Sequence, residues 1–229
     1  TQWLLPKADW HLPMKSTIMA VYQDEHPVQP LMRSTNIPRV WLLPAHPDLP
    51  PTLPYDQERH LAEGLSRLNL EDPRIDVILI DTQPGLYSLT RSAVIAARYV
   101  IFPFRLDEPS DNGTQRLFSF LEGVEASQQL VPLDLLGGVA NAYDETRLAE
   151  SKLLELRDHA LAHPRLKRSR LEPYSFWLAT VNRRADFPQA EHNQCSVFEL
   201  KGKSPAIAEI QSLTKGVLDR VNSYAYLPK

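Results

Sequence analysis

Residues 75–104 constrain the fold of this chain most, because they place a helix-length segment between two apolar runs of strand length. The first run, Ile75–Ile80, is β-branched or apolar apart from Asp76, which is typical of a strand buried on both faces of a parallel sheet. Ser88–Ala97 predicts a helix, and Arg98–Phe104 predicts a second buried strand. A strand, a helix and a strand in this order predict a βαβ unit, which joins parallel strands.

The same alternation continues to the end of the chain. It follows a proline-rich start, where residues 1–54 are expected to be irregular apart from a helix at Lys15–Tyr22 and a strand at Arg39–Leu43. The later pattern predicts helices at Tyr55–Leu68, Thr114–Leu130, Glu145–Ala162 and Pro205–Tyr224, and strands at Leu133–Tyr143 and Ser175–Val181. We therefore expect an α/β fold with a twisted, mainly parallel sheet and helices on both faces. No linker composition divides the chain, so we expect one domain over residues 1–229, irregular over 1–54 and regular over 55–229.

Charge and composition limit the class of partner. The 229 residues include 25 Lys and Arg against 28 Asp and Glu, so the net charge is −3 and any DNA contact must come from a local basic patch. The single cysteine, Cys195, agrees with a reducing compartment. No apolar run approaches the roughly 20 residues of a membrane span, so we expect a cytoplasmic protein with no membrane partner.

Asp81 is the first candidate functional residue. It follows the apolar run directly, and a carboxylate at the end of a buried strand is costly unless a cation, water or hydrogen-bond donors meet it. In doubly wound sheets, ligands bind at the carboxyl ends of the strands, and an aspartate there can hold the Mg²⁺ of a bound nucleotide. The alternative is an aspartate that stabilises the following turn.

Four segments carry a resemblance to a known family. In chain order they are VWLLPAHPDL, DVILIDTQPGLYSLTRSAVIAARYVIFPF, LLGGVANAYDETRLAESKLLELRDH and RRADFPQAEHNQCSVFEL. In this order they resemble the ParA/MinD family of partition ATPases, and the resemblance extends from about Ser16 to Arg220. It implies a P-loop NTPase-like fold, ATP and Mg²⁺ as cofactors, and a role in plasmid or chromosome partition or in cargo positioning.

The resemblance also implies site residues. Asp81 would act in catalysis and hold Mg²⁺ through water. The nucleotide-sensing switch would consist of the four residues that follow it, Thr82, Gln83, Pro84 and Gly85. The base would be bound by residues at the ends of two later strands, namely Asn141, Val181, Asn182 and Arg183. An Asn at a strand end forms turns as readily as it binds ligands, so that alternative stays open for Asn141.

The same resemblance implies a homodimer that binds DNA non-specifically when ATP is bound, associates with the nucleoid, and is stimulated by a ParB-like partner protein. The DNA contacts would come from the basic residues Arg165, Lys167, Arg168, Arg170 and Arg184. Such residues bind phosphates without reading the base sequence. The alternative is an ordinary solvated loop.

The chain departs from the family pattern in two places. Gln83 stands where the family switch has a proline, and the Lys-Gly-Gly-x-Gly-Lys-Thr P-loop does not occur; the only adjacent glycines, Gly137 and Gly138, lack the following lysine. A P-loop surrounds phosphates with backbone N–H groups, so this chain alone is expected to be inactive. We expect that an N-terminal P-loop unit is missing by truncation and that the intact protein is an ATPase. The alternative is a complete, non-catalytic interaction module or scaffold that pairs with a true ATPase.

Overall fold

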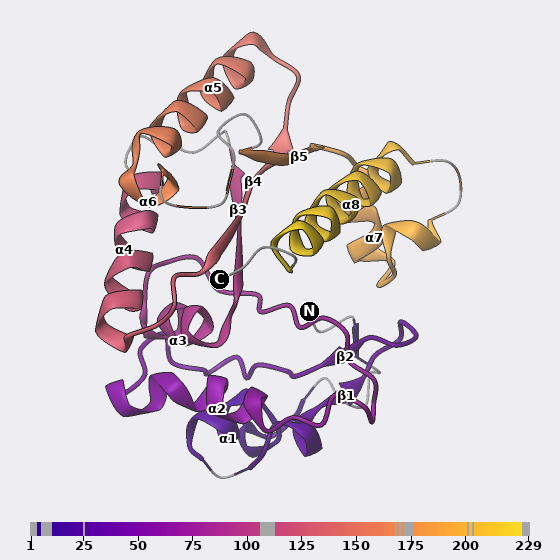
Figure 1. Cartoon of the computed structure of the whole chain (residues 1–229). Helices are drawn as coiled ribbons and strands as arrows, with labels where there is room; N and C mark the ends of the chain where they lie inside the picture. Colours follow the sequence, from indigo (N-terminus) through magenta and orange to yellow (C-terminus); the bar gives the residue numbers. More distant parts are fainter. Residues whose placement is uncertain are drawn as a thin grey trace. The chain divides into compact units, whose positions relative to one another are not determined.

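A computed structural model describes most of the chain (Figure 1). The described residues are 4–5, 11–24, 26–105, 113–167, 169, 171, 176–200, 202 and 204–225. The chain divides into two compact units: Thr1–Ala97 with Ser127–Leu130, and Arg98–Ala126 with Val131–Lys229. The division falls at residue 97 and not at residue 54, and the expectation of a single domain stays a prediction.

The first unit consists of short elements. Its helices are α1 (Ile18–Tyr22), α2 (His60–Ser66) and α3 (Ser88–Ala96), with 3-10 turns at Met14–Ser16, Gln29–Leu31 and Tyr55–Arg59. Strands β1 (Arg33–Ser34) and β2 (Trp41–Leu42) have two residues each and pair antiparallel. The many prolines keep regular elements short, as the sequence predicted for residues 1–54.

Two small apolar clusters hold the first unit together. Ala20, Val21, Val28 and Leu31 form one cluster. Tyr22, Leu53 and Leu61 form the other, and α3 adds Leu89 and Ala96 to it. A buried ion pair supports them, because the Arg91 Nε of α3 lies 2.9 Å from Glu58 Oε1.

The predicted strand at Ile75–Ile80 is wrong. This segment has no strand partner, and within the described part of the chain no hydrogen bond joins the backbone of residues 77–80 to another residue. A strand requires the ladder bonds of a neighbour, and an apolar sequence alone does not supply them. The predicted strand at Arg39–Leu43 is likewise reduced to the two residues of β2.

The second unit contains the parallel sheet that the sequence predicted. Its strands are β3 (Tyr99–Arg105), β4 (Asp134–Tyr143) and β5 (Trp177–Asn182), in the order β3-β4-β5. Both pairs are parallel, with Phe104 opposite Ala140 and Ala140 opposite Thr180. The predicted boundaries of these strands are correct to within two residues.

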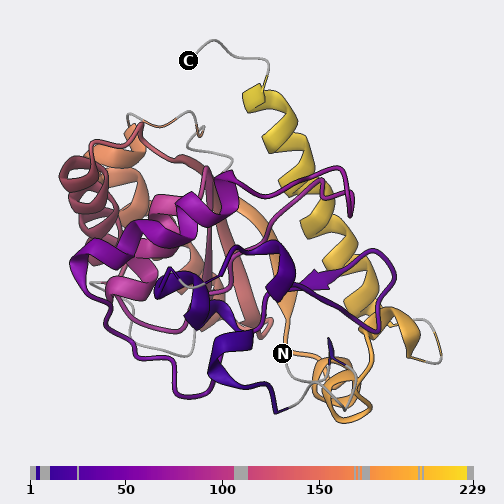
Figure 2. The same ribbon diagram turned by 90° about the horizontal axis from the view of Figure 1, so that it is seen from below.

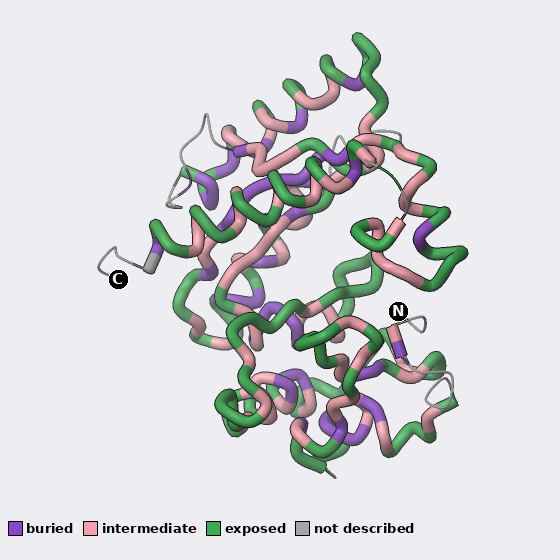
Figure 3. The backbone as a smooth tube through the Cα atoms, turned by 90° about the vertical axis from the view of Figure 1, so that its right-hand side faces the viewer, coloured by how far each residue is buried: buried purple, intermediate pink, exposed green. Residues whose placement is uncertain are grey.

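Helices cover both faces of this sheet (Figure 1). They are α4 (Gly113–Gln128), α5 (Arg147–Ala162) and the short α6 (Pro164–Lys167) on one face, and α8 (Pro205–Ala225) on the other. The short α7 (Asp186–His192) and a 3-10 turn at Val197–Glu199 connect β5 to α8. Figure 2 shows α8 as one unbroken helix, and exposed and half-buried residues alternate along it (Figure 3). The α/β fold with helices on both faces is therefore confirmed.

Local sequence explains how two of these elements form. Helix α5 begins where the Thr146 side chain accepts a hydrogen bond from the Ala149 N–H at 3.1 Å, which is a standard N-cap. In β4, Gly137 has φ +120°, and a Cβ there would lie 2.4 Å from the Phe176 carbonyl oxygen. Only glycine fits this close approach of two backbones. None of the described helices combines the length and apolar character that crossing a bilayer needs.

Candidate functional site

The segment around Asp81 lies in the first unit and is exposed. Val77, Ile78 and Leu79 are 65%, 45% and 85% exposed, which is unusual for three consecutive large apolar residues. Asp81 is also exposed, and its carboxylate makes no ion pair or hydrogen bond within the described residues. No hydrogen bond among the described residues therefore supports the alternative role, in which Asp81 stabilises its own turn. The carboxylate oxygens of Asp81 are accessible to a cation.

The four switch residues, Thr82, Gln83, Pro84 and Gly85, are exposed and end three residues before the first residue of α3, Ser88. Gly85 has φ +124°, and a Cβ there would lie 2.2 Å from the Tyr87 ring, so this segment requires glycine at this position. The Thr90 hydroxyl of α3 donates to the Gly85 carbonyl at 2.7 Å. This bond ties the conformation of the segment to the first turn of α3.

The predicted base-binding residues lie together at the carboxyl ends of β4 and β5 in the second unit. Asn141 is paired with Val181 across the parallel ladder, and Tyr143 is paired with Asn182. Asn141 is exposed, and its Oδ1 accepts a hydrogen bond from the Ala142 N–H at 3.0 Å. Ala142 has φ +53°, so Asn141 also takes part in a turn, which was the alternative left open for it.

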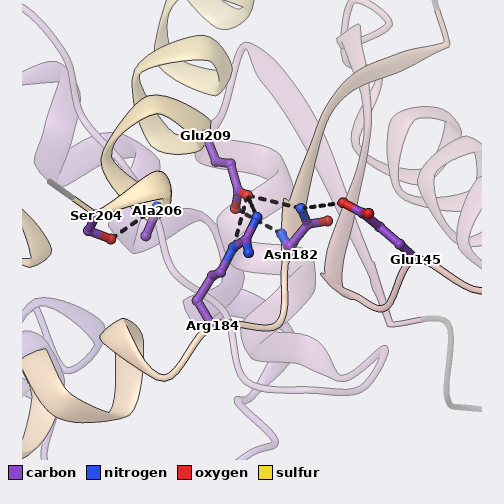
Figure 4. Close-up of polar contacts among 6 residues, drawn as sticks. All are labelled: Glu145, Asn182, Arg184, Ser204, Ala206 and Glu209. Atoms are coloured by element: carbon purple, nitrogen blue, oxygen red, sulfur yellow. Dashed lines mark hydrogen bonds and ion pairs between the residues drawn. The ribbon is translucent and has the colours of Figure 1, made fainter.

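Glu209 of α8 holds the end of β5 (Figure 4). Its Oε2 accepts the backbone N–H of Asn182 at 2.9 Å, and its Oε1 accepts the Asn182 Nδ2 at 3.0 Å. The same Oε1 accepts Arg184 Nη2 at 2.8 Å and Nε at 3.2 Å. One carboxylate from α8 therefore binds the last residue of β5 and a residue of the segment that follows it.

Glu145 extends this cluster from the loop between β4 and α5. Its Oε1 lies 3.4 Å from Asn182 Nδ2, so two carboxylates face the same amide (Figure 4). Hydrogen bonding to Glu209 raises the pKa of Arg184. Arg183 continues the cluster, because its Nε lies 3.2 Å from Asp144 Oδ2 and its N–H donates to the Tyr143 carbonyl at 2.9 Å.

The residues predicted to bind DNA do not form one group. Arg165 is 4% exposed, and its Nη2 lies 2.5 Å from Oε1 of Glu125, itself 8% exposed. Arg165 Nη2 also donates to the Leu133 carbonyl at 2.8 Å, which argues against the DNA-binding role expected for Arg165. Lys167 is exposed on α6, and Arg168 and Arg170 lie outside the described residues.

The structure thus groups some of the predicted residues in one unit. Asn141, Val181, Asn182, Arg183 and Arg184 share one edge of the sheet in the second unit, whereas Asp81 and the switch belong to the first unit. Sequence reasoning missed Glu145 and Glu209. The signal for Glu209 was its position three residues after Ala206 and four before Leu213, which places a carboxylate on the side of α8 that packs. Its side chain is 15% exposed.

Comparisons with known proteins place the chain in a family. A family model described as an AAA domain matches residues 7–131, which is more than half of the chain. The chromosome-partitioning ATPase Soj of Thermus thermophilus is 37% identical over 120 residues, which is 52% of this chain and 46% of Soj. The chain spans about half the length of the curated relatives it matches.

Two solved structures share the fold. A plasmid partition protein from Borrelia burgdorferi superposes with a TM-score of 0.61 at 18% identity, over 93% of this chain and 76% of that one. The septum site-determining protein MinD from Pyrococcus horikoshii, complexed with Mg-ADP, superposes with a TM-score of 0.59 at 16% identity, over 92% and 76%. At these identities the likeness establishes the architecture only.

Proposed function

Because this chain belongs to the ParA/MinD family of partition ATPases, we propose that the protein is an ATPase that acts in plasmid or chromosome partition or in cargo positioning. In this proposal the working form is a homodimer that binds DNA non-specifically when ATP is bound. A ParB-like partner stimulates hydrolysis, and the protein works in the cytoplasm on the nucleoid.

The residues of the second unit fit the base of a nucleotide. Asn141 and Asn182 supply amide donors and acceptors at the edge of the sheet where ligands of doubly wound folds bind. The MinD relative in fold was solved with Mg-ADP, which supports a nucleotide as the ligand. Asp81 would hold Mg²⁺ through water, and the metal would neutralise charge on the phosphates.

The residues given do not include a P-loop, so they offer no loop of this kind to bind the phosphates of a nucleotide. We propose that an upstream segment supplies one. The observation that carries this proposal is the exposed run Val77–Leu79, directly before Asp81. A run that is apolar on both of its faces is typical of a central strand, and a neighbouring strand would give its backbone the missing hydrogen bonds. The upstream strand would thereby deliver the P-loop to Asp81.

We propose that fewer basic residues bind DNA than the sequence suggested. Lys167 is exposed, and Arg168 and Arg170 follow it in the sequence. Arg184 is engaged by Glu209, and Arg165 is engaged by Glu125. A dimer that combines two such segments would bind phosphates without sequence preference, and its affinity would fall steeply with salt.

Titration calorimetry with Mg²⁺ and ATP tests the proposal, on this chain and on the protein extended upstream to its native start. We expect binding only by the extended protein, and loss of binding in Asp81→Ala. Asp219→Ala, a change of an exposed acid on α8, is the matched control and should leave binding intact. Absence of ATP binding by the extended protein would contradict the proposal and favour a non-catalytic module that pairs with a true ATPase.

A further inference from the structure

Glu209 makes four hydrogen bonds to the proposed base-binding edge. It accepts from the backbone and side chain of Asn182 and from two nitrogens of Arg184 (Figure 4). We propose that Glu209 is a positioning residue, which fixes the orientation of the Asn182 amide so that its oxygen serves as the acceptor for a purine amino group. This inference rests on the proposed function as a nucleotide-binding protein.

The orientation of the Asn182 amide follows from its neighbours. Nδ2 lies 3.0 Å from Glu209 Oε1 and 3.4 Å from Glu145 Oε1. A rotated amide would place Oδ1 against these two carboxylate oxygens, where oxygen meets oxygen and no proton is available. The two acidic residues therefore hold Nδ2 toward themselves and leave Oδ1 on the opposite side of the amide.

Asn182 Oδ1 has an unmet hydrogen-bonding requirement. It is buried and accepts no hydrogen bond within the described part of the chain. A buried acceptor without a partner is unfavourable, so a donor that reaches it is favoured over another acceptor. Neighbouring atoms cover this oxygen, so a base would reach it only after one of them turns aside.

The chemical consequence is a preference between purines. Adenine carries an exocyclic amino group, which can donate to Asn182 Oδ1, whereas hypoxanthine carries a carbonyl at the same ring position and cannot. A site with a committed acceptor discriminates strongly against an analogue that lacks the donor. Glu209 contributes to this preference without touching the base, through the amide that it orients.

Calorimetry on the full-length protein tests this with three ligands in Mg²⁺ buffer: ATP, ITP and inorganic tripolyphosphate. Glu209→Ala should weaken the binding of ATP about tenfold and bring the ratio of the ATP and ITP affinities close to one. The affinity for tripolyphosphate should not change. Asn182→Ala should likewise remove the preference for ATP over ITP. Glu209→Asp keeps a carboxylate and should retain part of the preference for ATP over ITP. Asp219→Ala on the same helix should leave all three affinities unchanged.

Each other outcome overturns a defined statement. Unchanged ATP affinity and preference in Glu209→Ala would overturn the positioning role. An equal loss of ATP and tripolyphosphate binding would indicate a general loss of structure and would overturn it as well. If the unsubstituted protein binds neither ATP nor tripolyphosphate, the proposed function fails, and this is visible before any variant is made.

Discussion

Two segments of this chain have similar sequences and different structures. Ile75–Asp81 and Leu135–Asp144 are both apolar runs that lead to polar residues. All of the second segment except Asp144 lies in β4, and its residues Leu135–Ala140 are buried between β3 and β5. The first pairs with no strand among the described residues, and it exposes Val77, Ile78 and Leu79. An apolar run can therefore form a strand, but it does so only where a neighbouring strand supplies hydrogen bonds to its backbone.

The polar groups of the two regions differ in the same way. At the end of β5, Glu209 and Glu145 bind Asn182 and Arg184. At the end of the Ile75–Ile80 run, the carboxylate of Asp81 has no partner among the described residues. The first arrangement is built by this chain alone, and the second is completed in our proposal by an upstream strand and a metal ion.

The largest effect is expected from Arg165→Ala, which removes one partner from a buried pair. Glu125 would remain buried with its charge uncompensated, so the free energy of unfolding should fall by about 3–5 kcal/mol. Chemical denaturation followed by circular dichroism measures this. Lys167→Ala, an exposed change on the same helix, is the control and should stay within about 0.5 kcal/mol of the unsubstituted chain. A small loss in Arg165→Ala would contradict the structural role of the pair.

A matched leucine pair addresses the comparison directly. Leu135→Ala in β4, where Leu135 is 1% exposed, should lower the free energy of unfolding by about 2–5 kcal/mol. Leu79→Ala should cost little in this chain, because Leu79 already lies in solvent. In the protein extended upstream, Leu79→Ala should become costly, since an inserted strand would bury the side chain. Equal costs for Leu79→Ala in both proteins would refute the inserted strand.

Amide hydrogen exchange compares the two segments residue by residue. Residues 77–80 make no backbone hydrogen bonds to the described residues, so their amides should exchange at nearly the rate of an unfolded chain. Amides of β4 should be protected up to the level of global unfolding. Upstream extension should slow exchange in residues 77–80 and leave β4 unchanged. Strong protection of residues 77–80 in the present chain would show that they are already paired.

The smallest effect is a pH dependence in the first unit. Burial raises the pKa of Tyr22 above its ordinary value of 10.0. Because the folded state binds this proton more tightly, the stabilisation is complete below pH 10 and is lost as pH rises through the raised pKa. Denaturation between pH 8 and 11 should show this loss, and Tyr22→Phe should reduce it. Tyr55→Phe, at an exposed tyrosine, should leave the pH profile as it was.

Much of the second unit could be predicted from the sequence. Strands β3, β4 and β5 and the helices α4, α5 and α8 lie close to the predicted positions, because each has a strong local pattern of apolar residues. The site was predictable in part: Asn141 and Asn182 follow strands, and parallel strands bring their carboxyl ends to one edge. Short elements such as α6 and α7 were missed because they have too few residues for a period.

The sequence by itself determined the class of fold, the order of most elements in the second unit and, through four ordered segments, the family. Only the tertiary structure decided that Ile75–Ile80 is not a strand here, that Arg165 is buried against Glu125, and that Glu209 binds Asn182 and Arg184. Periodicity is a local property, so it can be read along the chain. Ladder partners, buried ion pairs and contacts across 25 residues or more depend on which segments meet in space, and no local pattern contains that information.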